Sequence, residues 1–473
     1  SEDNFFKTAA DAEAAVMYAY GTLNYLEYSR TIFFLGDMAS ETMTTKSDAS
    51  ADNQDLNNWK VGNFKTNGSL ENFFKYAFIG VNRANAVIKK VPDAGFSQEQ
   101  KDLFLGEAYF LRAWNYFNLV RNFGLVPLHK SVVETVDQTS TALAPDMDAM
   151  YDLILSDCRR AAELLPVYET PKIGRADRVA AQALAAKAYL YVASAKEHGV
   201  KLYRDMHRDA TVMYDSAAYF AGEVIEKQSV YGFESSLLDI YDVEKARGKE
   251  HIFIMAMDRS GSSEGQYSKI SKMFIPYIDG ATLYLKQGDK DEYIPTHDGW
   301  GEYQTTVAFY NTFDASDKRK TELIVDKVYK ADGTLLGEYP GKIPYPFCRK
   351  YIDPKFEGDK TSTRPFLLRF SDVALIYAEA AGPTAKAYEL VNFIRSRAGL
   401  GDMKPNLGKD EVRREILKER TFELAFEGDH VYDLRRWNRI TTDVPEAAGL
   451  SEDQVTFYPI PQAEINLNGS LRP

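Results

Sequence analysis

Residues 97–123 constrain the fold more than any other part of the chain, because they read as one long helix with apolar residues around most of its circumference. Ser97 and Gln100 have the spacing of a capping box, and Gly124 supplies a stop. The apolar positions are Phe104, Ala108, Leu111, Trp114, Phe117 and Val120. A surface helix needs only one apolar stripe, whereas this pattern needs neighbours on several sides. The segment therefore predicts a helix inside a stacked helical array.

Helical periodicity recurs along both ends of the chain. We expect helices over residues 8–27, 70–90, 147–164, 176–195, 206–226, 370–381, 384–398 and 409–426, and over 431–437 after a break at Gly428. The alanine-rich segment 176–195 lets neighbouring helices approach closely, as in tetratricopeptide-type solenoids. The sequence therefore predicts a mainly all-α fold.

The middle of the chain has a different composition. Residues 251–365 are rich in Gly, Pro, Asp and Tyr, with one expected strand at 251–257, and they read as a large irregular insert with a few short β-hairpins. Inserts of this kind often carry function when a rigid scaffold holds them. We expect a helical half at 1–240 and a second half at 241–473, in one compact unit that ends in an extended tail at 457–473 packed along the body.

The charge balance and the cysteines exclude several protein classes. The chain has 69 acidic and 57 basic residues, a net charge of −12, with no basic stripe, which disfavours nucleic-acid binding. The sequence has no run of 18 apolar residues and so predicts no membrane span. We therefore expect the chain to be cytosolic or to have lost an upstream signal. The two cysteines, Cys158 and Cys348, form no disulfide framework and no zinc site, and a bond between them is left open.

No motif for catalysis stands out. The six His residues form no metal-binding pattern and there is no glycine-rich phosphate loop, so we predict no metal, no cofactor and no catalytic residue. Residues 261–265 fit the GxSxG pattern of serine hydrolases around Ser263, with His297 or His430 as the conceivable base. That motif requires a parallel sheet, which this chain does not predict, so we interpret the segment as a flexible Gly/Ser loop.

Acidic residues of the C-terminal helices admit two interpretations. Glu379, Glu423 and Glu427 could supply a carboxylate pair that cleaves glycosides in a helical barrel. The commoner role is pairing with arginines that fix helix packing, with Arg420 and Arg435 as candidates, and we favour it.

Four segments, taken in order, resemble the SusD/RagB family. They are GEAYFLRAWNYFNLVRNFGLVPL at 106–128; LRFSDVALIYAEAA at 368–381 with VNFIRSRAG at 391–399; KERTFELAFEG at 418–428 with YDLRRW at 432–437; and YPIPQ at 458–462 with Glu464, Asn466 and Asn468. Each motif alone is weak, but four in the family's order are specific.

The resemblance implies a fold, a location and a partner. The fold would be a right-handed α-α superhelix of tetratricopeptide-like helix pairs with an irregular binding face. The protein would be a cell-surface, outer-membrane lipoprotein that binds oligosaccharide or polysaccharide for nutrient uptake and has no catalysis of its own. A lipidated Cys upstream of Ser1 would anchor it, and its partner would be a SusC-like TonB-dependent barrel. The alternatives are a glycoside hydrolase of helical-barrel type and a cytosolic peptide-binding adaptor.

The same motifs suggest a buried cluster near the C-terminus. Arg435, Arg436 and Trp437 look like surface residues by type, yet they sit within a family core motif after the break at Gly428. We expect all three to be substantially buried, with Glu427 and Asp429 as candidate partners of the arginines.

Candidate sugar-binding residues come from two polar loops. Sugars stack their C–H faces on aromatic rings and bind their hydroxyls to amides, carboxylates and guanidinium groups. Trp59 and Trp300 are flanked by Gly, Asn and Asp, so little in their local sequence could bury them. The resemblance places family ligands between an early loop and the central insert. It implies stacking on Trp300 and Trp59, with Tyr303, Tyr293, Asn63, Asp37 and Asp298 as auxiliary residues.

Overall fold

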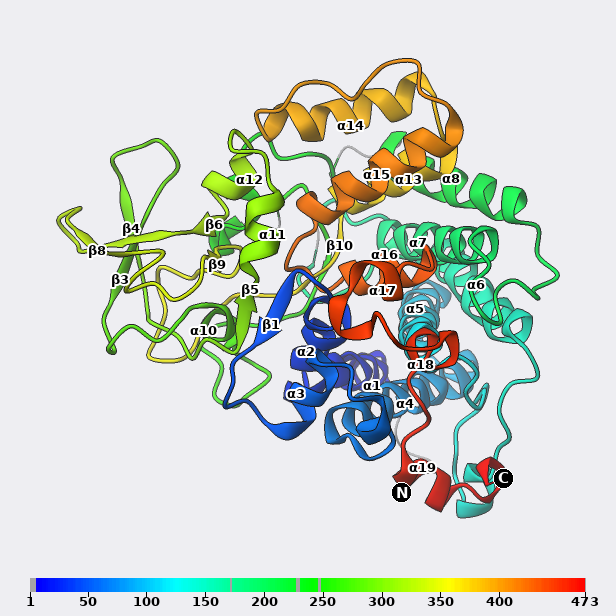
Figure 1. Ribbon diagram of the computed structural model, residues 1–473. Helices are drawn as coiled ribbons and strands as arrows, with labels where there is room; N and C mark the ends of the chain where they lie inside the picture. The colour runs from blue at the N-terminus through cyan, green and yellow to red at the C-terminus, as the bar shows by residue number, and fades with distance from the viewer. Residues whose placement is uncertain (1–5, 171, 227–229, 246–247, 473) are drawn as a thin grey trace.

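The computed structural model describes residues 6–170, 172–226, 230–245 and 248–472, and its body is a series of packed helices (Figure 1). The helices of its first half are α1 (Ala9–Tyr20), α2 (Leu26–Phe33), α3 (Ala51–Asn57), α4 (Gly68–Lys90), α5 (Gln98–Phe123), α6 (Met147–Leu164), α7 (Arg178–Glu197), α8 (Ala210–Glu226) and α9 (Leu237–Ile240). From α4 to α8, each helix packs against the next one in the chain. The prediction of a mainly helical fold is confirmed.

Helix α5 is the central element of this body. The Ser97 hydroxyl accepts a hydrogen bond from the Gln100 amide at 3.3 Å, and between Phe104 and Phe123 every residue except Tyr109 is buried. The predicted multi-sided burial is therefore confirmed. Its buried charged residues Glu107 and Arg112 are paired with Arg175 and Asp157, since charged groups are costly inside a protein unless partnered. The Arg112 guanidinium, for example, donates to both carboxylate oxygens of Asp157 at 2.7 and 2.8 Å.

The first predicted helix is wrong in its continuity. Residues 8–27 form α1, then a 3-10 turn at Gly21–Asn24, and α2 starts at Leu26. The break falls at Tyr25, whose extended backbone interrupts the helical hydrogen bonds. A π-helix at Phe34–Met38 follows α2 and carries Asp37 into the interior.

Among the described residues, short strands form four small antiparallel sheets, and the largest of them projects to the left in Figure 1. This largest sheet has the order β4-β3-β7-β8, and the strands are β3 (Leu283–Lys286), β4 (Tyr293–Thr296), β7 (Lys327–Tyr329) and β8 (Leu335–Glu338). The paired strands elsewhere are β2 (His251–Ile254) with β10 (Phe366–Arg369), and β6 (Ile324–Val325) with β9 (Phe347–Cys348). The helices of the insert are α10 (Ile270–Phe274), α11 (Val307–Thr312) and α12 (Lys318–Thr321).

One strand pair joins the early chain to the insert. β1 (Met43–Thr45) pairs antiparallel with β5 (Tyr303–Thr305), with Met43 opposite Thr305. The segment after the π-helix and the loop before β5 are thereby fixed side by side, although about 260 residues separate them in sequence.

The C-terminal helices complete the body. They are α13 (Phe370–Ala381), α14 (Ala385–Arg397), α15 (Lys409–Glu423), α16 (His430–Arg436), α17 (Ile440–Asp443), α18 (Glu452–Thr456) and α19 (Gln462–Leu467). The tail packs along the body as expected, since the Tyr458 amide donates to the Asn122 carbonyl at 2.7 Å. It is not wholly extended, however, because α19 forms within it.

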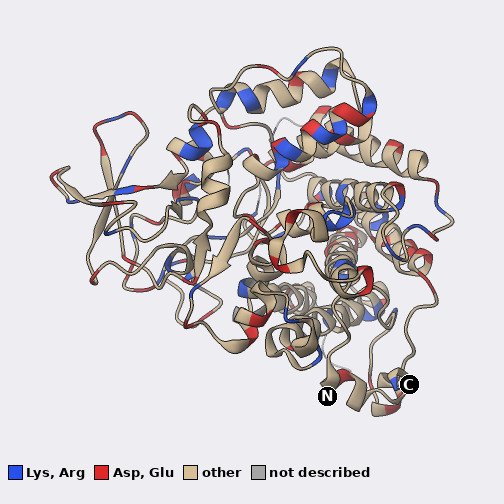
Figure 2. Ribbon diagram, viewed as in Figure 1, with Lys and Arg blue, Asp and Glu red and all other residues tan. Residues whose placement is uncertain are grey.

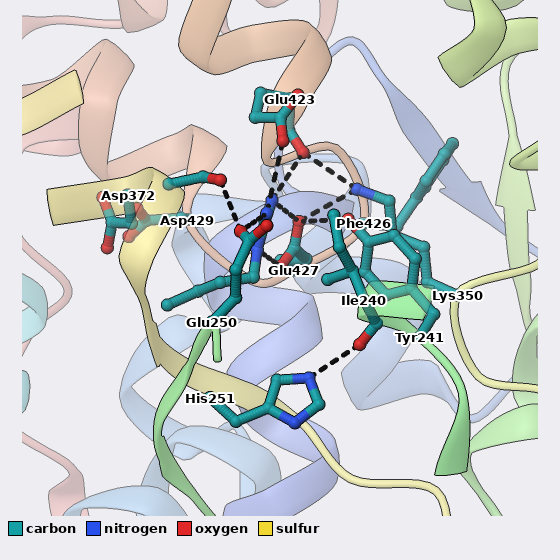
Figure 3. A network of polar contacts seen from close by, with 12 residues as sticks. Ile240, Tyr241, Glu250, His251, Lys350, Asp372, Glu423, Phe426, Glu427 and Asp429 are labelled. Carbon is teal, nitrogen blue, oxygen red and sulfur yellow. Dashed lines mark hydrogen bonds and ion pairs between the residues drawn. The ribbon is translucent and has the colours of Figure 1, made fainter. Parts of the chain in front are cut away.

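Buried ion pairs join separate segments of residues 250–427. The Arg369 guanidinium, 1% exposed, contacts Glu250, Glu423 and Glu427 at 2.8 to 3.2 Å. Lys350 donates to Glu427 at 2.9 Å, and Figure 3 shows the carboxylates of Glu250, Glu423 and Glu427 converging from separate elements. The surrounding cations hold the pKa of Glu423 well below its usual range against the effect of burial. The interpretation of the C-terminal glutamates as packing partners is confirmed, with different arginines from those expected.

The predicted cluster near the C-terminus is confirmed in part. Arg435 and Arg436 are each 2% exposed, whereas Trp437 is half-buried. Arg436 pairs with Glu379 and Asp433. Arg435 instead donates to the backbone carbonyls of Arg121 and Val455, so the expected pairing with Glu427 or Asp429 is wrong. Glu427 and Asp429 serve other cations of the network. Cys158 and Cys348 are both buried and free.

Candidate functional site

Trp300 lies in the loop between β4 and β5, with its ring partly exposed beside the core. Backbone contacts with the α10 region fix the loop. The Trp300 amide donates to the Lys272 carbonyl at 2.7 Å, and the Gly301 amide donates to the Ile275 carbonyl at 2.9 Å. Gly299 allows this approach, because a Cβ there would lie 1.9 Å from the Ile275 oxygen. The backbone therefore positions the indole without covering it fully.

Two lysines lie beside this indole, and one of them also lies near a second ring. The ammonium groups of Lys269 and Lys272 lie 5.8 and 5.6 Å from the Trp300 ring centre. The Lys269 ammonium is also 5.9 Å from the ring centre of Tyr267, and the Lys360 ammonium lies 5.0 Å from the same ring. Lys269 therefore lies within reach of two partly exposed aromatic rings.

Two carboxylates complete what we call the Trp300 surface, which comprises Glu264, Tyr267, Lys269, Lys272, Trp300, Asp359 and Lys360. Glu264 pairs with Lys269 at 2.9 Å, and Asp359 pairs with Lys272 at 2.6 Å. The hydrogen bonds from these lysines lower the pKa of both carboxyls, so both are ionised at neutral pH. Their side chains stay 44% and 50% exposed and can accept further hydrogen bonds from solvent or a ligand.

The loop that matched the GxSxG pattern forms the edge of this surface. Gly265 has φ +90°, and a Cβ there would lie 2.6 Å from the carbonyl oxygen of Asn24, so the insert packs closely on the end of the first helical segment. Ser263 is exposed in a turn whose amide faces the Gln266 side chain. His297 instead contacts Ser271 at 2.9 Å and His430 contacts Glu41 at 2.6 Å. Among the described residues, neither histidine is hydrogen-bonded to Ser263, so Ser263 lacks the base that a serine nucleophile needs.

Several predicted site residues are buried, and their expected exposure is wrong. Trp59 is 3% exposed, because Phe64 and Tyr458 cover its ring. Tyr303 is 1% exposed in an aromatic cluster with Phe33, Phe34 and Phe274, and its hydroxyl donates to the Arg30 carbonyl at 3.3 Å. Neither ring can stack on a sugar in this structure.

The two predicted aspartates accept hydrogen bonds from backbone amides. Asp37 is fully buried and accepts a hydrogen bond from the Gly428 amide at 2.8 Å. Asp298 is 9% exposed and accepts from the amides of Ile278 and Gly280 at 3.2 and 2.8 Å. Both carboxylates therefore hold backbone segments in place, and neither is presented to a ligand.

Tyr293 and Asn63 are accessible but belong to other surfaces. Tyr293 lies on β4, with its ring 5.0 Å from that of Tyr329. Asn63 donates to Asp55 at 3.0 Å in the polar segment after α3. Within the described residues, no hydrogen bond, ion pair or ring contact joins either one to Trp300. Of the seven predicted residues, Trp300 alone takes part in the Trp300 surface.

Sequence reasoning missed the lysines and Tyr267 for an identifiable reason. Residues 264–272, 300 and 359–360 come from three insert segments that are joined by backbone hydrogen bonds, between Ser268 and Thr361 and between Trp300 and Lys272. Tyr267 and Lys269 do follow the Gly/Ser loop directly, and that proximity is the one local signal that could have found them. Among the described residues, no group of three or more His, Cys, Asp or Glu is arranged to hold a metal ion.

Comparisons with known proteins agree along the chain. A family model described as "SusD family" matches residues 329–455, and one described as "Starch-binding associating with outer membrane" matches residues 2–190. SusD-like protein P2 of Formosa agariphila is 26% identical, over 100% of this chain and 93% of its own length. SusD-like protein P38 of that organism is 24% identical, over 97% of this chain and 89% of its own length.

Solved structures share the fold. A laminarin-binding SusD-like protein superposes with a TM-score of 0.78 at 24% identity, covering 97% of each chain. Surface glycan-binding protein A from Bacteroides thetaiotaomicron, in complex with laminarihexaose, gives a TM-score of 0.75 at 20% identity and 98% coverage of both chains. Within the described residues, no helix has the length and hydropathy needed to cross a membrane.

Proposed function

The chain belongs to the SusD/RagB family of glycan-binding proteins, and from this premise we propose that it binds oligosaccharide or polysaccharide at the cell surface and delivers it to a SusC-like TonB-dependent outer-membrane transporter. The observation that carries the binding part is the Trp300 surface. The delivery step and the lipid anchor rest on the family resemblance and on the description of the family matched at residues 2–190. Ser1, the reference point for that anchor, lies outside the described residues.

The chemistry of the Trp300 surface suits a sugar. Carbohydrates present apolar C–H faces, which stack on indole and phenol rings, beside hydroxyls that both donate and accept hydrogen bonds. Here Trp300 and Tyr267 supply rings, Lys269 and Lys272 supply donors, and Glu264 supplies an ionised acceptor. Because the lysines are already paired with carboxylates, the surface offers fixed donors without a large net charge.

Laminarin is the first glycan to test, because two proteins of similar fold are named for laminarin or bound laminarihexaose. The parent protein and a Trp300→Ala variant would be compared by isothermal titration calorimetry with laminarihexaose, maltohexaose and a panel of other oligosaccharides. Tyr219→Ala is the matched control, since Tyr219 is a 62% exposed tyrosine on α8, outside the Trp300 surface.

We expect Trp300→Ala to weaken binding of the recognised glycan by about fivefold or more, since loss of an aromatic ring on which nucleobases stack costs about 1–3 kcal/mol. Tyr219→Ala should bind like the parent, and the melting temperatures of all three proteins should agree closely. Equal affinity of Trp300→Ala and the parent would place the glycan elsewhere. Release of reducing ends from the glycan by the purified protein would instead favour a hydrolase.

The partner and location have their own test. Native protein should be recovered from washed outer membranes, and a large β-barrel should co-purify after mild detergent extraction. Recovery in the cytosolic fraction would contradict both the anchor and the transporter.

A further inference from the structure

A polar cleft of about 570 Å³ lies where the helical body meets the insert. Residues 236–243 of the body form one wall, and residues of the β3–β4 turn, of the segment after α12 and of the segment after β9 form the others. We call it the Arg349 cleft; the argument uses its residues Asp242, Gln287, Asp289, Lys290, Glu322 and Arg349. Its volume lies within the roughly 300–1,000 Å³ usual for small-ligand sites.

Arg349 is the distinctive group of this cleft. It is 7% exposed, and its guanidinium donates to the Lys286 carbonyl and the Gln287 side-chain oxygen. Within the described part of the chain, no carboxylate lies at ion-pair distance from it, whereas Arg369 contacts three. Burial lowers the pKa of Arg349 to about 10, and only the charge of Glu322 acts against this. A buried cation without a counter-ion is costly, so a ligand acceptor at this position would be favourable.

Acceptors surround this donor. Glu322 is half-buried, and burial and the nearby Asp289 raise its pKa, because both disfavour its charged form. Asp239, Asp242, Asp289 and Glu292 add further carboxylates, of which Asp239 is paired with Lys245, and Lys290 adds a second cation. Leu238, Ile294 and Pro354 contribute apolar wall. The cleft thus combines one desolvated donor with several acceptors over a partly apolar lining.

This mixture selects among ligand classes. The carboxylates of Asp242, Asp289 and Glu322 repel an anion, although Arg349 alone would attract one. A simple cation would meet Arg349 and Lys290. Neutral polyols avoid both conflicts, because each hydroxyl can accept from the guanidinium and donate to a carboxylate.

We propose that the Arg349 cleft is a second sugar-binding site, which holds a neutral sugar unit through hydrogen bonds and has no exposed stacking ring. The proposal rests on the proposed function in that its ligand is a glycan, but it uses none of the residues of the Trp300 surface. A polysaccharide that reaches both sites at once would engage the protein bivalently, which raises the apparent affinity without new contacts.

The experiment separates the two sites. Saturation-transfer difference NMR would be recorded with laminaribiose, maltose and cellobiose, and with glucuronic acid as an anionic comparator. The proteins would be the parent, Trp300→Ala, Arg349→Met and the double variant. Arg349→Met keeps the side chain's length and removes its buried charge, so it should fold with an unchanged or higher melting temperature.

In the Trp300→Ala protein, transfer to at least one neutral disaccharide should persist and exceed that to glucuronic acid. The affinity of the double variant for that disaccharide should be at least tenfold lower than that of Trp300→Ala. Glu322→Gln on the Trp300→Ala background should weaken the binding as well. Equal transfer to Trp300→Ala and the double variant, stronger transfer to glucuronic acid, or no transfer to Trp300→Ala would each overturn the cleft proposal. If Arg349→Met loses all binding while Trp300→Ala keeps it, the cleft stands and the Trp300 surface fails.

Discussion

The indole N–H of Trp59 donates a hydrogen bond to the backbone carbonyl of Ala39 at 2.9 Å, deep inside the protein. The Trp59 ring stacks on Tyr458 of the C-terminal tail, with centroids 6.1 Å apart and planes 15° from parallel. A residue of an early polar loop thus links the segment after the π-helix to the last part of the chain. Its role is in stability, which distinguishes it from Trp300.

Truncation of Trp59 should destabilise the protein without altering its binding surface. Trp59→Ala should lower the free energy of unfolding by about 3–5 kcal/mol, the usual cost of removing a buried large aromatic side chain. Trp59→Phe should cost less, because it keeps a stacking ring and loses chiefly the hydrogen bond. Urea denaturation measures both. Glycan affinity below the melting transition should match the parent; a selective loss of affinity in a stable Trp59→Phe protein would return this residue to the site.

Removal of Arg436 should be among the more costly single changes. Its guanidinium pairs with Glu379 at 2.9 Å and with Asp433 at 3.0 Å, and all three residues are buried. Arg436→Ala leaves the Glu379 carboxylate without its cation, so we expect a loss of about 3–5 kcal/mol. Arg436→Met combined with Glu379→Gln should recover much of that loss, because neither charge is then buried. A double-mutant cycle in chemical denaturation tests this coupling.

Arg435 next to it should matter less. It is equally buried, but it bonds to the carbonyls of Arg121 at 3.2 Å and Val455 at 3.5 Å, with no carboxylate partner among the described residues. Arg435→Ala strands no buried anion, so its cost should be about 1–3 kcal/mol, typical of charge-assisted hydrogen bonds. Thermal unfolding of the two alanine variants side by side gives the ranking. A larger loss for Arg435→Ala than for Arg436→Ala would contradict the role assigned to Glu379.

Asp37 should make stability depend on pH near neutrality. Burial raises its pKa from 3.8 to about 7, with Asp429 and Glu427 adding to the rise and the Gly428 amide and His430 opposing it. The pKa of Asp37 is therefore higher in the folded protein than in the unfolded one. The stability that its protonated form contributes is complete below pH 4 and is lost as the pH rises through 7. Asp37→Asn keeps an acceptor for the Gly428 amide and cannot ionise.

Between pH 5 and pH 8, the parent should therefore lose roughly 2–3 kcal/mol of unfolding free energy relative to Asp37→Asn. Denaturation of both proteins at the two pH values gives this difference, and titrating groups that do not interact with Asp37 cancel. A difference that stays constant, or that grows in favour of the parent at pH 8, would show that Asp37 ionises normally in the fold.

Charge is spread over the molecule in a way that agrees with composition. Figure 2 shows basic and acidic residues interspersed over the helices and the insert, with no continuous basic stripe in that view. The buried charges are the exception that composition could not reveal, since Arg369, Arg397 and Arg420 look like surface residues by type.

The helical body could be predicted from local sequence. Periodicity and caps are local properties, so the helix 147–164 was predicted to the residue and α5 was predicted with its burial, because its apolar positions leave no face for solvent. The order of four motifs likewise identified the family, since each motif is a contiguous stretch that requires no knowledge of contacts.

The exposure of the loop residues, by contrast, depends on how distant segments pack. Trp59 and Trp300 have similar polar neighbours in sequence, yet Tyr458, about 400 residues away, covers the first, while β1–β5 pairing and the α10 contacts leave the second partly open. Tyr303 was buried by Phe33 and Phe274, and Asp37 was turned inward by a π-helix. Exposure depends on partners brought together from distant parts of the chain, and no local pattern of residue types encodes those partners.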